Sequence, residues 1–122
     1  MSRKTLCRTL LGNKCEYLTV SSAESSAKHK KGVIVMARVH PGETVSSWMM
    51  QGSLRTIIGL IEFLVDPNNK EAAILRNNFV FKIIPMLNPD GVVNGNYRCS
   101  MAGCDLNRQW DKPSKVGTPC NK

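Results

Sequence analysis

Residues 32–43 read G-V-I-V-M-A-R-V-H-P-G-E, and this stretch joins a strand-like run to two side chains of metal-ligand type. Its first part is apolar and β-branched, which is typical of a buried strand. Pro41 disfavours helix at His40, and Gly42 permits a tight turn, so the chain should leave the strand at His40. Sheets of α/β proteins commonly build their sites at the carboxyl ends of strands. We therefore expect His40 and Glu43 to lie together at such an end.

The pair His40 and Glu43 has two interpretations. Zinc binds imidazole nitrogen and carboxylate oxygen, and a catalytic zinc site uses three protein ligands and a water. The pair supplies two ligands, so a third must come from elsewhere in the fold. The alternative is that His40 simply packs beside the turn and that Glu43 interacts with a helix dipole. The two residues alone leave both interpretations open.

Hydrophobic spacing predicts strands and helices that alternate along the chain. The expected elements are a strand over 15–20, a polar loop over 21–31, one amphipathic helix over 44–65, a short helix over 71–76, a strand over 79–85 and an irregular tail over 112–122. Within the long helix, Trp48, Met49 and Met50 are assigned to core packing. Residues 88–91, N-P-D-G, have the pattern of a type I turn. Strand, helix, strand is the unit of an α/β sheet, so the expected fold class is α/β.

The length and composition of the chain limit its class. At 122 residues it is long enough for one domain with a core. It contains no run of about twenty apolar residues, and its basic amino terminus lacks the apolar segment of a signal peptide. We therefore expect a cytoplasmic chain that does not span a membrane. The five cysteines form no Cys-x-x-Cys pair, so neither a disulfide framework nor a zinc ribbon is indicated.

The formal charge of +8 suits an acidic partner. Nucleic acid, a membrane surface and an acidic polypeptide all fit the sign of this charge. Few aromatic residues lie among the basic ones, which weakens the case for binding single-stranded nucleic acid by stacking.

Two later segments carry the candidate functional arginines. Arg98 follows Gly95-Asn96-Tyr97, and Asn107 precedes Arg108 in a polar stretch. A guanidinium group presents a planar fork that suits carboxylates and developing oxyanions. Each arginine taken alone is equally consistent with an ordinary surface side chain.

Taken in order, these segments form a family pattern. The blocks that carry it are A-R-V-H-P-G-E-T at 37–44, F-K-I-I-P-M-L-N-P-D-G-V at 81–92, G-N-Y-R-C-S at 95–100, and Gly103 with D-L-N-R-Q-W at 105–110. The sequence resembles the zinc metallocarboxypeptidases, and within them the cytosolic carboxypeptidases, the branch associated with removing glutamate from polyglutamylated proteins such as tubulin. The resemblance implies a mixed sheet with flanking helices. Residues 1–122 would then be an incomplete, amino-terminal part of the catalytic domain, ending before the later strands.

The resemblance also implies roles for individual residues. His40 and Glu43 match the family's first two Zn²⁺ ligands. Arg98 matches the catalytic arginine that polarises the scissile carbonyl and steadies the oxyanion. Asn107 and Arg108 match the substrate-binding pair that holds the terminal carboxylate. The implied partners are acidic polypeptide tails, with polyglutamylated tubulin as an example.

One departure from the family pattern limits what we expect of this chain. The family has a second histidine ligand and a general-base glutamate at later positions, and no residue here matches either; the other histidine, His29, lies upstream in a lysine-rich loop. We therefore expect little or no peptidase activity from this chain alone, and a sheet with an exposed edge and an uncovered apolar face.

Two other functions compete with the peptidase. One is a non-catalytic module that binds acidic, carboxylate-ended tails through the arginines. The other is a basic nucleic-acid binder, which explains the charge but leaves His40, Glu43, Asn107 and Arg108 without a role.

Overall fold

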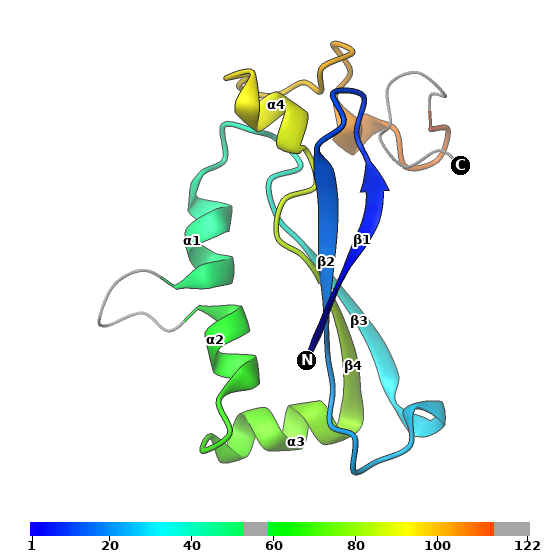
Figure 1. The fold of residues 1–122 in the computed structure, drawn as a ribbon, viewed down its shortest axis with the longest axis vertical. Helices are drawn as coiled ribbons and strands as arrows, with labels where there is room; N and C mark the ends of the chain where they lie inside the picture. The colour runs from blue at the N-terminus through cyan, green and yellow to red at the C-terminus, as the bar shows by residue number, and fades with distance from the viewer. Residues whose placement is uncertain (53–58, 114–122) are drawn as a thin grey trace.

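The computed structural model describes residues 1–52 and 59–113, which form a four-stranded sheet with helices packed on one face (Figure 1). The elements in chain order are β1 (Ser2–Arg8), β2 (Lys14–Val20), the 3-10 turn η1 (Ala27–His29), β3 (Lys31–Met36), α1 (Val45–Gln51), α2 (Leu60–Val65), α3 (Lys70–Asn78), β4 (Phe79–Ile84), α4 (Pro89–Val93) and the 3-10 turn η2 (Leu106–Arg108).

The sheet is mixed, with strand order β1-β2-β4-β3. Strands β1 and β2 form an antiparallel hairpin, β2 is antiparallel to β4, and β3 is parallel to β4. The register places Val33 beside Phe81 and Val35 beside Ile83. Because side chains alternate between faces along a strand, all four point to the same side of the sheet. The predicted α/β class is therefore correct.

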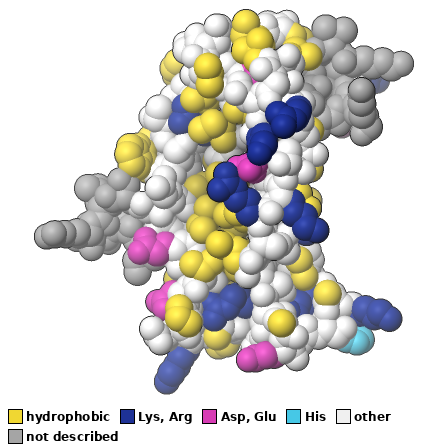
Figure 2. Space-filling view, viewed as in Figure 1, with side chains coloured by type: hydrophobic (Ala, Val, Ile, Leu, Met, Phe, Trp, Pro, Cys, Tyr) yellow, Lys and Arg dark blue, Asp and Glu magenta, His cyan; other side chains and the backbone are white. Residues whose placement is uncertain are grey.

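The core lies between that side of the sheet and helices α1, α2 and α3 (Figure 1). Met50 of α1 and Leu64 of α2 are buried against Val20, Phe81 and Ile83 of the strands. Leu64 and Ile83 are fully buried, and each such side chain stabilises the fold by about 2 kcal/mol. This apolar seam is visible between the strands and the helices in Figure 2, with Lys and Arg side chains lying over the sheet beside it.

The expectation of one helix over 44–65 is wrong. Helix α1 ends at Gln51 because Gly52 has a φ of 70°, which lies outside the helical region, and α2 starts only at Leu60. The residues between Gly52 and Gly59 lie outside the described part of the chain. With the helix divided, Met50 is buried, but Trp48 and Met49 are 56% and 68% exposed, so their assignment to the core is also wrong.

Other predicted boundaries agree with the structure to within a few residues. The strand predicted over 79–85 is β4, and the segment 21–31 is a loop except for the short turn η1. The N-P-D-G segment starts helix α4 instead of forming an isolated turn, because the Asn88 side chain accepts a hydrogen bond from the amide of Gly91 and caps the helix. Most of the irregular tail expected from residue 112 lies outside the described residues.

Helix α4 also holds the β1–β2 hairpin in place. The buried carboxylate of Asp90 accepts hydrogen bonds from the Thr9 hydroxyl, the Leu11 amide and the Asn13 side chain. Burial raises the pKa of Asp90, but these three hydrogen bonds outweigh burial and leave the pKa below its usual value. The hairpin loop is therefore joined to the loops at one end of the sheet.

The helices of the described residues are short. None of them is long and apolar enough to cross a lipid bilayer.

Candidate metal and substrate site

The candidate site begins where the chain leaves β3. After Met36, residues Ala37 and Arg38 continue alongside the segment that follows β4, with Ala37 N donating to Ile84 O (3.0 Å) and Asn88 N donating to Arg38 O (3.1 Å). The chain then turns at residues 40–43 and enters α1. The turn is closed by a hydrogen bond from Glu43 N to His40 O (3.2 Å), which places both side chains at the carboxyl end of β3, as expected.

The imidazole of His40 lies between two carboxylates. His40 is 7% exposed; its Nδ1 is 2.8 Å from Glu43 Oε1, and its Nε2 is 3.0 Å from Asp105 Oδ1. If the neutral ring donates Nε2–H to Asp105, the Nδ1 lone pair faces the Glu43 carboxylate. The lone pair and the carboxylate repel each other. A cation between His40 Nδ1 and Glu43 Oε1 would replace this repulsion by two attractive contacts, so the two donors fit a zinc ion.

Asp105 connects the candidate ligand pair, His40 and Glu43, to Arg98. It accepts hydrogen bonds from His40 Nε2, Arg98 Nε (2.8 Å) and the amide of Asn107 (2.9 Å). Burial raises the pKa of Asp105, and these hydrogen bonds lower it by more, so the carboxylate is held in its charged form. Sequence reasoning assigned Asp105 no role. A signal existed, because a carboxylate commonly orients the second nitrogen of a metal-binding histidine, but the residue lies 65 positions from His40.

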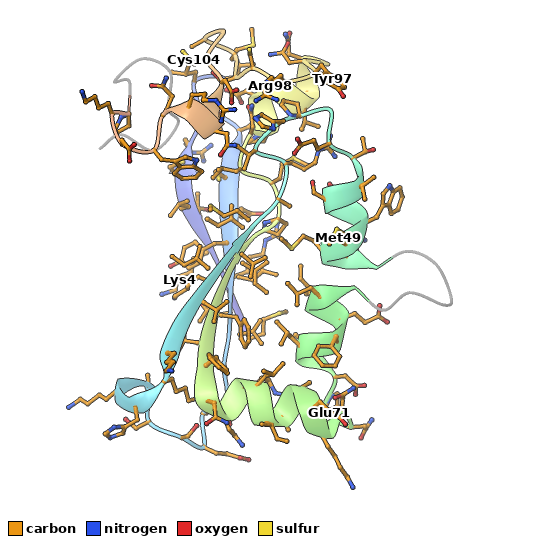
Figure 3. All side chains as sticks on the ribbon, turned by 180° about the vertical axis from the view of Figure 1, so that it is seen from behind. Lys4, Met49, Glu71, Tyr97, Arg98 and Cys104 are labelled. Atoms are coloured by element: carbon orange, nitrogen blue, oxygen red, sulfur yellow. The ribbon has the colours of Figure 1, made fainter. Side chains whose placement is uncertain are left out.

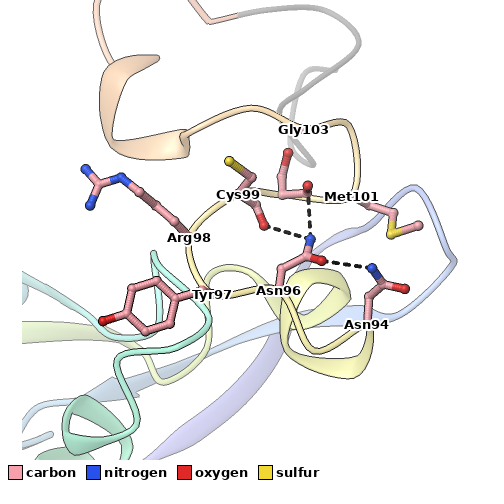
Figure 4. Close-up of a pocket in the computed structure, with 8 residues that line it drawn as sticks. Asn94, Asn96, Tyr97, Arg98, Cys99, Met101 and Gly103 are labelled. Carbon is pink, nitrogen blue, oxygen red and sulfur yellow. Dashed lines mark hydrogen bonds between the residues drawn. The ribbon is translucent and has the colours of Figure 1, made fainter.

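Residues 94–103 form a loop that presents Arg98 beside this cluster. Asn96 holds the loop together, because its amide donates to Cys99 O (3.0 Å) and Ser100 O (3.3 Å) and accepts from Asn94 (2.8 Å) (Figure 4). A pocket of about 390 Å³ lies along the loop. Figure 3 shows Tyr97, Arg98 and Cys104 at one end of the molecule and Glu71 at the other.

The loop also packs on the His40 turn. The amide of Gly42 donates to Tyr97 O (2.7 Å), and the Tyr97 ring lies against Gly42 so closely that a Cβ atom there would be 2.5 Å from Cδ2. The position of Arg98 is therefore coupled to that of His40 and Glu43 through backbone contacts.

Asn107 and Arg108 lie on η2, and Asp105 caps the amino terminus of this turn. Both are exposed; the Asn107 side chain accepts a hydrogen bond from Trp110 Nε1 (2.8 Å), and Arg108 donates to Asn107 O (3.2 Å). The pair is thus joined to the His40 cluster through Asp105, and the Arg108 guanidinium is accessible to a ligand.

The described residues do not form a complete metal-binding group. They contain no group of three or more His, Cys, Asp or Glu side chains placed to hold a metal ion, so His40 and Glu43 would be two ligands of a larger set. The other histidine, His29, precedes β3, whereas His40 follows it. The six-residue strand separates them by about 20 Å, and η1 lies at the end of the sheet opposite α4 (Figure 1).

Comparison with known proteins gives matches over nearly the whole chain. The zinc carboxypeptidase family profile matches residues 1–122. Cytosolic carboxypeptidase 2 of Danio rerio is 52% identical over 120 residues, covering 96% of this chain and 16% of that protein. Human cytosolic carboxypeptidase 4 is 50% identical over 117 residues, covering 89% of this chain and 10% of that protein. The chain therefore spans less than a fifth of the length of these relatives.

Solved structures show the same similarity. The metallo-carboxypeptidase from Burkholderia cenocepacia superposes with a TM-score of 0.84 at 34% identity, covering 97% of this chain and 30% of that chain. The metallo-carboxypeptidase from Pseudomonas aeruginosa gives a TM-score of 0.80 at 33% identity, covering 96% of this chain and 29% of that chain. The sequence profile, the relatives and the fold agree, and the chain belongs to the zinc carboxypeptidase family of metal-dependent peptidases.

Proposed function

We propose that this chain forms part of the catalytic unit of a zinc-dependent carboxypeptidase that removes carboxyl-terminal residues, glutamates in particular, from acidic protein tails. The observation that carries the proposal is the contact of 2.8 Å between His40 Nδ1 and Glu43 Oε1, with Nε2 of the same ring held by Asp105. The names of the relatives support a cytosolic enzyme, and polyglutamylated tubulin is the substrate that the family resemblance suggests.

Each proposed site residue has a distinct part in this function. His40 and Glu43 would hold zinc, which when bound supplies a Lewis acid and an acidified water. Arg98 donates to Asp105 from Nε and its side chain is about half exposed, so its terminal amino groups could donate to a scissile carbonyl oxygen. Asn107 and Arg108 offer an amide and a guanidinium group for the terminal carboxylate of the substrate.

We infer that the 122-residue chain alone has little peptidase activity. Two ligands leave zinc weakly held, and no residue of this sequence matches the glutamate that the family resemblance implies as general base for the attacking water. Turnover of a glutamate-terminated peptide by the isolated, zinc-loaded chain at a rate typical of enzymes, about 1 per second or more, would contradict this inference.

Zinc titration by calorimetry tests the metal site itself. We expect one-to-one binding that weakens by tenfold or more in Glu43→Gln, because the amide keeps the size of the side chain and removes the anionic ligand. Glu71→Gln is the matched control, since Glu71 lies on α3 at the opposite end of the molecule (Figure 3). Equal zinc affinity in both variants and the wild type would exclude His40 and Glu43 as the ligand pair.

A binding module for acidic tails is a second candidate. It is favoured by the exposure of Arg98 and Arg108 within a described region that lacks a three-ligand metal group. Fluorescence anisotropy with a labelled oligoglutamate peptide in the presence of a chelator separates the two functions. Metal-independent binding that is lost in Arg108→Gln, retained in Lys28→Gln and reduced when the peptide's terminal carboxylate is amidated would favour the module.

A further inference from the structure

The backbone of Arg38 adopts a conformation that side chains rarely adopt. Its φ is 54°, in the left-handed region, and it is the single described residue other than glycine with a positive φ. A branched or long side chain persists there only when its surroundings hold it. Arg38 lies two residues before His40, so the contacts that hold it bear directly on the His40 turn.

The Arg38 side chain spans the turn that carries both candidate zinc ligands. Its guanidinium group donates from Nε (2.9 Å) and Nη2 to Pro41 O, and from Nη1 to Ser47 Oγ (3.0 Å). Pro41 lies between His40 and Glu43, and Ser47 lies on α1 just beyond them. One planar group therefore ties the turn to the helix that follows it.

The Arg38 backbone makes a second set of ties. Its amide donates to Ser46 Oγ (3.2 Å), and that hydroxyl donates to Glu43 O (2.7 Å). Its carbonyl accepts from Asn88 N (3.1 Å), which is buried beside β4. The segment from Arg38 to Ser47 is thus closed on itself and fixed to the sheet.

We propose that Arg38 is a positioning residue that holds His40 and Glu43 on the same side of the turn. This role rests on the proposed function. Arg38 itself would contact neither the metal nor the substrate. Arg38 keeps His40 Nδ1 and the Glu43 carboxylate aimed at one point, so zinc binding does not have to order the turn.

Electrostatics alone predicts the opposite effect on zinc. A cation beside a metal site repels the metal, so removal of the guanidinium charge should strengthen zinc binding if Arg38 acted only through its charge. A positioning role predicts that zinc binding weakens. The sign of the change in zinc affinity therefore separates a positioning role from an effect of the charge alone.

Three substitutions of Arg38 separate the effect of its backbone conformation from the effect of its side-chain contacts. Arg38→Ala removes the guanidinium contacts and leaves the strained φ. Arg38→Gly removes the same contacts and also relieves the strain, since glycine adopts positive φ freely. Arg38→Lys keeps the charge but lacks the planar fork that reaches Pro41 and Ser47 together.

Hydrogen exchange of the metal-free chain reads the turn directly. The reporters are the amides of Gly42, Glu43 and Thr44, which donate to Tyr97 O, His40 O and Gly42 O. We expect about tenfold faster exchange at these amides in Arg38→Ala and Arg38→Gly, and a smaller increase in Arg38→Lys. Unchanged exchange in both Arg38→Ala and Arg38→Gly would overturn the proposal.

Zinc affinity provides the functional measurement. We expect about tenfold weaker binding in Arg38→Ala and Arg38→Gly even though Arg38→Gly should unfold at a higher temperature than Arg38→Ala. A merely structural role would make zinc affinity follow thermal stability, so wild-type affinity in Arg38→Gly would overturn the proposal.

Arg76→Ala is the matched control. The Arg76 guanidinium also donates to backbone carbonyls, those of Leu64 (2.8 Å) and Asp66 (3.0 Å), but it lies on α3 away from His40. Arg76→Ala should lower thermal stability without a selective increase in hydrogen exchange at the amides of residues 42–44. If the wild-type chain binds no zinc, the proposed zinc-binding role of His40 and Glu43 in this chain fails, while hydrogen exchange still decides whether Arg38 holds the turn.

Discussion

Gly42 shows at the residue scale how little room the site leaves. A Cβ atom at this position would lie 2.5 Å from Tyr97 Cδ2 and 2.8 Å from Tyr97 O, both closer than real contacts allow. We expect Gly42→Ala to destabilise the chain by about 2 kcal/mol, because either the His40 turn or the Tyr97 loop must shift. Chemical denaturation measures this change in the free energy of unfolding.

Gly32→Ala is the control for Gly42→Ala. A Cβ atom on Gly32 meets nothing within 4 Å, and the residue is already in a strand. Its stability should stay within about 0.5 kcal/mol of the wild type. A similar loss in both variants would mean that the contact with Tyr97 is not the cause.

Asp105 is the second residue whose contacts predict a measurable effect. Asp105→Asn removes the anion that orients His40 Nε2 and pairs with Arg98, while the size of the side chain is kept. We expect zinc affinity to fall about tenfold, measured by calorimetry. Asp111→Asn, at an exposed position, should bind zinc as the wild type does, and equal affinities in both variants would argue against a role for Asp105.

At the scale of elements, the α4 to hairpin connection makes stability depend on pH. The folded-state pKa of Asp90 is lowered, so its ionised form stabilises the fold above the unfolded pKa of about 3.9. That stabilisation is lost as the pH falls through the lower, folded-state pKa. Acid unfolding followed by circular dichroism should therefore show a decline in stability below about pH 4.

Asp90→Asn tests this connection. We expect a loss of about 2 kcal/mol at pH 7, because the donors from Thr9, Leu11 and Asn13 lose a charged acceptor, and a weaker dependence of stability on acid. Glu24→Gln, an exposed residue in the loop after β2, should change neither. An acid profile identical to that of the wild type would assign the pH dependence to other carboxylates.

The division of the long amphipathic segment is also decided between elements. Apolar residues at helical spacing run from Trp48 to Val65, so periodicity favours one helix. In the structure α1 ends at Gln51, just before Gly52, and packing against the sheet then buries Met50 and Leu64 from two separate helices. Periodicity predicted helix over the residues of α1 and α2, but it did not locate the break at Gly52, because a glycine within a helical pattern is common.

At the scale of the whole molecule, the two edges of the described sheet differ. Strand β1 carries the exposed cations Arg3, Lys4 and Arg8, which discourage pairing with another chain. Strand β3 is the other edge, and on the face away from the helices Ile34 is 67% exposed and Met36 is 38% exposed. An exposed apolar edge strand is a template for self-association.

Ile34→Thr should therefore reduce self-association of the chain. Threonine keeps a β-branched side chain suited to a strand and removes apolar surface at the edge. Sedimentation velocity at increasing protein concentration measures self-association. We expect self-association to begin at concentrations several-fold higher in Ile34→Thr than in the wild type. Val93→Thr is the control, because Val93 is 73% exposed on helix α4. Equal improvement in both variants would indicate general hydrophobicity instead of the β3 edge.

The sequence by itself determined the α/β class, most strand positions, the family and the closeness of His40 to Glu43. These features follow from hydrophobic periodicity, from motif order and from a three-residue separation that any tight turn keeps short. The tertiary structure decided that Asp105 meets His40 and Arg98 and that Asn88 N donates to Arg38 O beside the His40 turn. Contacts between residues far apart in the chain depend on strand order and loop packing, which no local pattern of residues specifies.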